Sequence, residues 1–213
     1  MRTLTRELRD ALTPLMALDV LRKGNERFVN NLKANRNLLQ QVNETSDSQH
    51  PMAIILSCID SRAPAETIKG LGDIFSCRVA GNVLNDDILG SMEFACKVAG
   101  AKAIVVLGHT RCGAVKGACD GVELGNLTTL LHKIQDAIAL ETETLGDRTA
   151  ANSEFVERVA ELNVLLVKSQ IMQRSPLLAE MVRKSEIALV GGMYDVESGA
   201  VEFYDSRMLI GAA

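Results

Sequence analysis

The chain has 213 residues, of which 47% are hydrophobic, which is enough to bury one substantial core. Its formal net charge is −4, and because nucleic-acid-binding domains normally present a basic face, the composition argues against a nucleic-acid partner. The apolar runs are all much shorter than the roughly 18 residues of a membrane-spanning helix. We therefore expect a cytoplasmic protein without a membrane partner. The five cysteines are odd in number, which favours packing or metal binding over a disulfide framework.

The first 50 residues predict a helical arm that is distinct from the rest of the chain. Thr13-Pro14 provides a helix cap and a first-turn proline. Apolar residues then recur at helical spacing, namely Leu15, Leu18, Leu21 and Phe28. Residues 35–50 are polar and predict a connecting loop. The apolar side of this arm has to pack on the main body or on a second subunit, so we divide the chain into an arm (1–50) and an α/β domain (51–213).

The pattern changes to strand-like runs from residue 52 onward. Met52–Cys58, Ile74–Val79 and Lys102–Gly108 are continuously apolar, which is typical of parallel strands that are covered on both faces. The segment 85–100 between the last two predicts a crossover helix. The fold class predicted is therefore α/β, with a mostly parallel central sheet flanked by helices.

The second half of the chain predicts further helices and a final hairpin. We expect helices over Leu127–Glu143 and Ser153–Arg174, and a shorter helix after Pro176. Two last strands are expected over Ile187–Gly192 and Ala200–Tyr204, joined by a turn at residues 195–199.

Residues that commonly bind metals follow two of the predicted strands. Cys58 lies at the end of the first strand, and His109 and Cys112 lie in the segment that follows the third. Parallel strands end at the same edge of a sheet, so these three side chains should lie close together. Two thiolates and one imidazole suit zinc, and three protein ligands leave a fourth position for water or substrate. Cys77 and Cys119 fit no ligand spacing and are interpreted as packing thiols.

A charged pair accompanies the first cysteine. Asp60 and Arg62 are two residues apart at the strand end, so both side chains can point to the same side. A guanidinium beside a carboxylate fixes its orientation and lowers its pKa. We therefore expect Asp60 to remain an anion that accepts a hydrogen bond beside the metal.

Three blocks of sequence together resemble the β-class carbonic anhydrases: Cys58-Ile-Asp60-Ser-Arg62, Val79-Ala-Gly-Asn82 and His109-Thr-Arg-Cys112-Gly. The resemblance extends over residues 14–205. It implies one zinc ion per chain, held by Cys58, His109 and Cys112, with Asp60 and Arg62 as a catalytic dyad. It also implies interconversion of CO2 and bicarbonate by a zinc-bound hydroxide, and a homodimer or homotetramer in which the arm wraps a partner subunit.

One departure from the family pattern keeps two other hypotheses open. The loop at residues 63–74 is shorter than in many relatives and has no glutamine, which relatives carry near the substrate. The same zinc site could instead hydrolyse a related small substrate such as COS or CS2. If the shortened loop blocks the fourth metal position, the protein would be a catalytically silent zinc-binding homologue.

Overall fold

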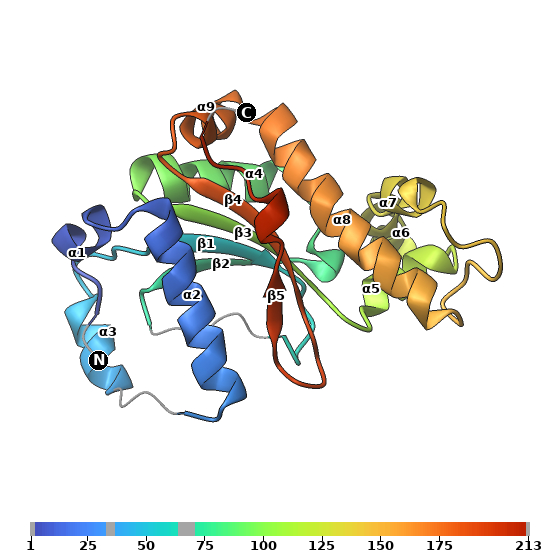
Figure 1. Ribbon diagram of the computed structural model, residues 1–213, viewed down its shortest axis with the longest axis horizontal. Helices are drawn as coiled ribbons and strands as arrows, with labels where there is room; N and C mark the ends of the chain where they lie inside the picture. Colours follow the sequence, from blue (N-terminus) through green and yellow to red (C-terminus); the bar gives the residue numbers. More distant parts are fainter. Residues whose placement is uncertain (1–2, 33–36, 64–70, 212–213) are drawn as a thin grey trace.

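The centre of the fold is a five-stranded sheet with the strand order β2-β1-β3-β4-β5 (Figure 1). The computed structural model describes residues 3–32, 37–63 and 71–211. The first four strands of the chain run parallel, and the last runs antiparallel to its neighbour. The strands are β1 (Ala53–Ser57), β2 (Ile74–Arg78), β3 (Ala103–His109), β4 (Ala188–Tyr194) and β5 (Val201–Phe203). The predicted mostly parallel sheet and the closing hairpin are confirmed.

Helices flank this sheet on both faces. They are α1 (Arg6–Asp10), α2 (Pro14–Val29), α3 (Leu38–Glu44), α4 (Asp86–Glu93), α5 (Gly113–Cys119), α6 (Gly125–His132), α7 (Gln135–Leu140), α8 (Ser153–Arg174) and α9 (Pro176–Arg183). Three shorter segments are the 3-10 turns η2 (Ala80–Asn82) and η4 (Asp205–Arg207) and the π-helical η3 (Phe94–Val98), which continues α4.

The two faces of the sheet are covered by different helices. Because successive side chains of a strand alternate between faces, Ile54 and Leu56 of β1 pack in the core formed with α4, α5 and α8. Ala53 and Ile55 face the other way, toward α2. Every residue of β1, β3 and β4 is buried. β2 differs from the prediction, because it is an edge strand whose residues are half-buried or exposed.

The arm begins as predicted, with Thr13 capping α2 and Pro14 in its first turn. Leu18 and Leu21 are fully buried against the sheet of the same chain. Leu15 and Phe28, which the pattern placed on the same apolar side, are exposed. Figure 1 shows α2 lying across the sheet. The arm packs on its own chain along one side of α2, and it presents apolar side chains on the other.

Two further predicted segments differ from the structure. The single helix expected over residues 127–143 is divided into α6 and α7, because Lys133 and Ile134 donate to carbonyls three residues back and Ile134 turns fully into the core. The loop expected over residues 35–50 contains α3, which Asn37 caps by accepting the Gln40 N–H at 3.0 Å. Among the described helices, none combines the length and apolarity needed to cross a bilayer.

Candidate metal centre

The pairing of β1 with β3 brings the three predicted ligands together. The two strands are parallel and in register, with Ser57 opposite Leu107, so their carboxyl ends lie at the same edge of the sheet. Cys58, His109 and Cys112 each offer one donor atom, and these atoms all lie within 4.8 Å of one another. All three residues are buried. The three side chains therefore lie close together, as the sequence predicts.

The imidazole of His109 is oriented by the loop that follows it. Nδ1 lies 2.9 Å from the carbonyl oxygen of Thr110, and since a carbonyl only accepts, Nδ1 carries the proton. In the neutral imidazole, Nε2 then keeps its lone pair for a metal. Nε2 is buried and has no hydrogen-bond partner among the described residues. The tautomer and the orphaned nitrogen are those of a metal-binding histidine.

The contact between the two thiols moves their pKa values in opposite directions. A hydrogen bond from Cys112, together with further donors that include the Gly81 N–H at 3.3 Å from Sγ, outweighs burial and lowers the pKa of Cys58 to about 4. The same contact with Cys58, and burial, raise the pKa of Cys112. One sulfur is therefore already a thiolate, which is the form that binds metal.

The donor set fits zinc. Sulfur and imidazole nitrogen are ligands that zinc prefers, and all three here are buried. Zinc binds four ligands in a tetrahedron, so three protein ligands leave one position open, as in catalytic sites. Asp60 is not a member of this group of three. Its Oδ2 nevertheless lies 3.9 Å from Nε2 of His109, beside the group.

Asp60 is held by Arg62 as expected. Nε of Arg62 donates to Oδ1 at 3.0 Å, and Nη2 donates to Oδ2 at 2.8 Å. The backbone N–H of Arg62 also donates to Oδ1 at 2.9 Å. These contacts hold the pKa of Asp60 well below its usual range, so the carboxylate stays ionised.

Arg78 supports the same loop from the neighbouring strand, a role that the sequence analysis missed. Its Nε donates to the carbonyl oxygen of Cys58 at 2.9 Å, and its Nη2 donates to that of Asp60 at 2.6 Å. The register of β1 with β2 places Arg78 opposite Ser57. Only that register, which the sequence pattern does not specify, could have pointed to this contact.

The remaining cysteines lie outside the group of three. Burial raises the pKa of Cys77, and it raises the pKa of Cys119 to about 11 and that of Cys96 to about 12. All three thiols therefore stay protonated near neutral pH, as packing thiols do. The predicted effect of the short loop at residues 63–74 concerns residues 64–70, which lie outside the described residues.

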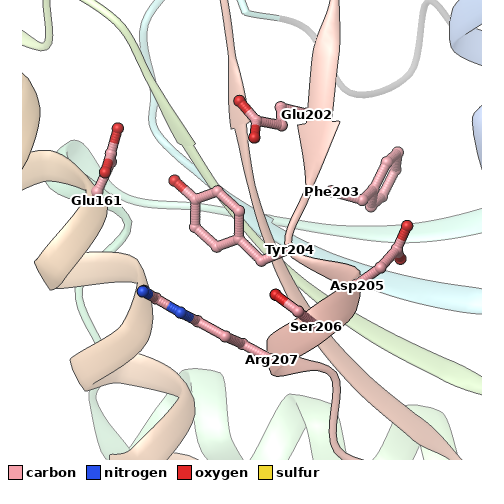
Figure 2. A pocket seen from close by; sticks show the side chains of 7 residues that line it. All are labelled: Glu161, Glu202, Phe203, Tyr204, Asp205, Ser206 and Arg207. Carbon is pink, nitrogen blue, oxygen red and sulfur yellow. The ribbon is translucent and has the colours of Figure 1, made fainter.

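A separate surface pocket lies between α8 and the β5–η4 segment (Figure 2). Its lining includes Glu161 from α8, Tyr204 and Arg207. Burial and the nearby carboxylates of Glu161 and Glu202 raise the pKa of Tyr204. The three donors of the candidate metal centre do not line this pocket, so the two sites are distinct.

Comparison with known proteins identifies the family. Residues 53–201 match the family model described as carbonic anhydrase. The chain is 34% identical over 200 residues to carbonic anhydrase 2 of Mycobacterium tuberculosis, covering 90% of this chain and 93% of that protein. It is 32% identical over 193 residues to a carbonic anhydrase of Mycolicibacterium smegmatis, covering 89% and 92%.

Solved structures agree with these sequence matches. The β-carbonic anhydrase CafA of Aspergillus fumigatus superposes with a TM-score of 0.66 at 30% identity, covering 79% of this chain and 82% of that one. The Coccomyxa β-carbonic anhydrase, solved with acetazolamide, has a TM-score of 0.71 at 20% identity and shares the fold. The chain therefore belongs to the β-class carbonic anhydrases, and it is an enzyme of that family.

Proposed function

We propose that this chain catalyses the reversible hydration of CO2 to bicarbonate and a proton, with one zinc ion per chain held by Cys58, His109 and Cys112. The observation that carries the proposal is the clustering of three buried donor atoms within 4.8 Å of one another, beside a carboxylate that Arg62 keeps ionised. Zinc held by these ligands would supply Lewis acidity, which would lower the pKa of a bound water to about 7 and so provide a nucleophile near neutral pH.

The carboxylate of Asp60 is the proposed hydrogen-bond acceptor for the attacking water. Its Oδ1 already accepts two hydrogen bonds from Arg62, whereas Oδ2 accepts one. Oδ2 is also the oxygen that faces Nε2 of His109. The oxygen with spare acceptor capacity therefore points toward the donor group, where it can accept a hydrogen bond from the water and so orient the water's lone pair toward CO2. An ionised Asp60 can only accept, which fixes the direction of that hydrogen bond.

Arg62 acts on the reaction through Asp60. Its two-point contact fixes the plane of the carboxylate, and its positive charge keeps the proton off Asp60. We assign Asp60 as the catalytic residue and Arg62 as its positioning partner. Both assignments depend on where the water is held, so they are tested together with the metal ligands.

We also propose that the arm, residues 1–50, joins two copies of the catalytic domain, residues 51–213. The arm exposes apolar side chains beyond those that α2 buries, including Leu38 at 60% and Leu39 at 71%. Exposed apolar surface of this kind commonly marks a protein interface. A solved chain that shares the fold at 22% identity comes from a pair of tetrameric β-carbonic anhydrases of Sordaria macrospora. Sedimentation will decide between dimer and tetramer here.

We place the protein in the cytoplasm, because its five cysteines are free.

Stopped-flow measurement of CO2 hydration on protein of known zinc content tests the proposal. We expect rapid hydration with one zinc per chain, loss of zinc and activity in Cys58→Ser, and loss of activity with zinc retained in Asp60→Asn. Lys184→Ala, which removes an exposed ion pair with Glu180, serves as the control. Full zinc occupancy without hydration between about pH 6.5 and about pH 9 would overturn the proposal. Turnover of COS or CS2 by that same preparation would then support the alternative hydrolase.

A further inference from the structure

The helix α8 carries a buried amide that the proposed reaction does not use. Asn163 is 1% exposed, and its Nδ2 donates to the carbonyl oxygen of Gly81 at 2.9 Å. Its Oδ1 is buried and has no hydrogen-bond partner within the described part of the chain. An amide that is only half satisfied in a core costs stability. General stabilisation therefore does not explain why an asparagine is placed here.

Gly81 connects this amide to the candidate metal centre. The N–H of Gly81 donates to Sγ of Cys58 at 3.3 Å, while its carbonyl accepts from Asn163. Gly81 has φ +67°, and a Cβ at this position would lie 2.8 Å from Cδ1 of Ile134 and 3.3 Å from Cβ of Ala114. The residue is therefore enclosed, with one polar group bound to α8 and the other aimed at the sulfur.

We propose that Asn163 is a positioning residue for the metal centre, which holds Gly81 so that its N–H points at the Cys58 sulfur. A hydrogen bond to a coordinating sulfur fixes the ligand's orientation and withdraws some of its negative charge, as partners behind metal ligands generally do. Asn163 thus influences the metal from α8 without touching it. This inference rests on the proposed zinc site.

A matched control exists on the opposite face of the sheet. Asn25 of α2 is also buried, and its Nδ2 donates to the carbonyl oxygen of a glycine, Gly199, at 2.8 Å. Its Oδ1 accepts the N–H of Val201 at 2.9 Å. It holds the β4–β5 hairpin, and its partners are not the three metal donors or their loops. A variant at Asn25 therefore reports the general cost of removing a buried asparagine.

The test compares Asn163→Leu with Asn25→Leu on purified full-length protein. Zinc affinity is measured by competition with a chromophoric chelator, and the sulfur-to-metal charge-transfer band is measured after cobalt substitution. We expect Asn163→Leu to weaken zinc binding about 10- to 100-fold and to shift the band. We expect Asn25→Leu to leave both unchanged, even where it lowers the melting temperature. Unchanged affinity and band in Asn163→Leu would overturn the inference, as would equal changes in both variants.

Two further variants keep the test decisive if Asn163→Leu does not fold. Asn163→Ser retains a hydroxyl donor and Asn163→Ala has none, so the serine variant should keep more of the zinc affinity than the alanine variant. Equal losses in the two would count against the inference. Failure of the proposed zinc site looks different, because the unmodified protein would then bind no zinc or cobalt at Cys58, His109 and Cys112. Failure of the proposed reaction alone would leave the unmodified protein with zinc bound but without CO2 hydration, and the comparison of the asparagine variants would still apply.

Discussion

The guanidinium of Arg62 donates to both carboxylate oxygens of Asp60, with distances of 3.0 Å from Nε to Oδ1 and 2.8 Å from Nη2 to Oδ2. Two parallel hydrogen bonds fix a plane, which a single point charge does not. The orientation of the acceptor oxygen beside His109 is therefore set by the shape of the arginine side chain as well as by its charge.

The variant Arg62→Lys distinguishes the effect of the guanidinium's planar shape from the effect of its charge. Lysine keeps the positive charge but loses the two-point contact, so we expect kcat/KM for CO2 hydration to fall about 10- to 100-fold with zinc content unchanged. Stopped-flow kinetics and metal analysis measure both. Arg174→Lys, in an exposed pair with Asp86, should change neither. Wild-type kinetics in Arg62→Lys would show that the charge alone is sufficient.

Gly81→Ala should be costly for two separable reasons. The left-handed backbone at φ +67° disfavours any side chain, by about 1–2 kcal/mol, and the added Cβ would also meet Cδ1 of Ile134 at 2.8 Å. We expect a loss of at least about 1 kcal/mol in the free energy of unfolding by urea, accompanied by weaker zinc binding. Adding Ile134→Val removes that methyl group and should restore part of the stability, but not the part that comes from φ. Gly90→Ala, with open space around it, should cause no loss.

The sequence pattern predicts some of these features and not others. Continuous apolarity identified β1 and β3 because both strands are buried on both faces, and the rule for parallel strand ends brought Cys58, His109 and Cys112 together. β2 has a similar pattern but lies at the edge of the sheet. Burial of an edge strand depends on its neighbours, which the local pattern does not contain.

Contacts that depend on tertiary structure could not be predicted in this way. Asn163 is a polar residue in a long helix, and nothing in the helical spacing distinguishes a buried amide from an exposed one. The break between α6 and α7 arises because Ile134 turns into the core, although the segment has apolar residues at helical spacing throughout. The role of Arg78 required the register of β2.

The lowered pKa of Glu141 should make the free energy of unfolding depend on pH. Burial raises its pKa, but hydrogen bonds from Thr144 and Glu143 and the ion pair with Arg148 at 2.6 Å outweigh burial, so the pKa lies below its usual value. A lowered carboxyl pKa stabilises the fold above the unfolded-state pKa of about 4.3, and this contribution is lost as the pH falls through the folded-state pKa.

We therefore expect Glu141→Gln to lower the melting temperature at neutral pH. The difference from the unmodified protein should shrink as the pH falls below about 4. Thermal unfolding followed by circular dichroism across this range measures it. Glu154→Gln, whose exposed carboxylate pairs with Arg158, should show a much smaller effect at every pH. A constant difference for Glu141→Gln would indicate lost packing.

Metal removal should lower stability as well as activity. A ligand that binds only the folded state stabilises it by about 2.7 kcal/mol when present at about 100 times its dissociation constant. We expect a chelator to lower the melting temperature of the unmodified protein and to leave that of Cys58→Ser unchanged. Zinc retention should also fall as the pH falls, because protons compete for the thiolates. A chelated protein with unaltered melting would mean that no metal is bound at the site.

The proposed role of the arm in joining two copies can be tested by placing a charged residue on its exposed side. Leu39→Asp places a carboxylate on a side chain that is 71% exposed, so it should hardly affect the fold but should oppose burial against a second copy. Sedimentation equilibrium should show a shift toward the monomer. Leu145→Asp, at a position that is 97% exposed in a loop beyond α7, should leave the assembly unchanged. Equal behaviour of the two variants would place the interface elsewhere.

The positions of the three donors in the chain have a consequence for how the protein matures. Cys58 follows β1, whereas His109 is the last residue of β3 and Cys112 follows it, and β2 and α4 are synthesised between Cys58 and β3. The complete donor set therefore does not exist on a nascent chain until Cys112 has left the ribosome and β3 has paired with β1. For the proposed zinc site, acquisition of the metal would thus require that β3 has paired with β1. A chain that ends before Cys112 lacks the third donor, so it cannot form the complete site.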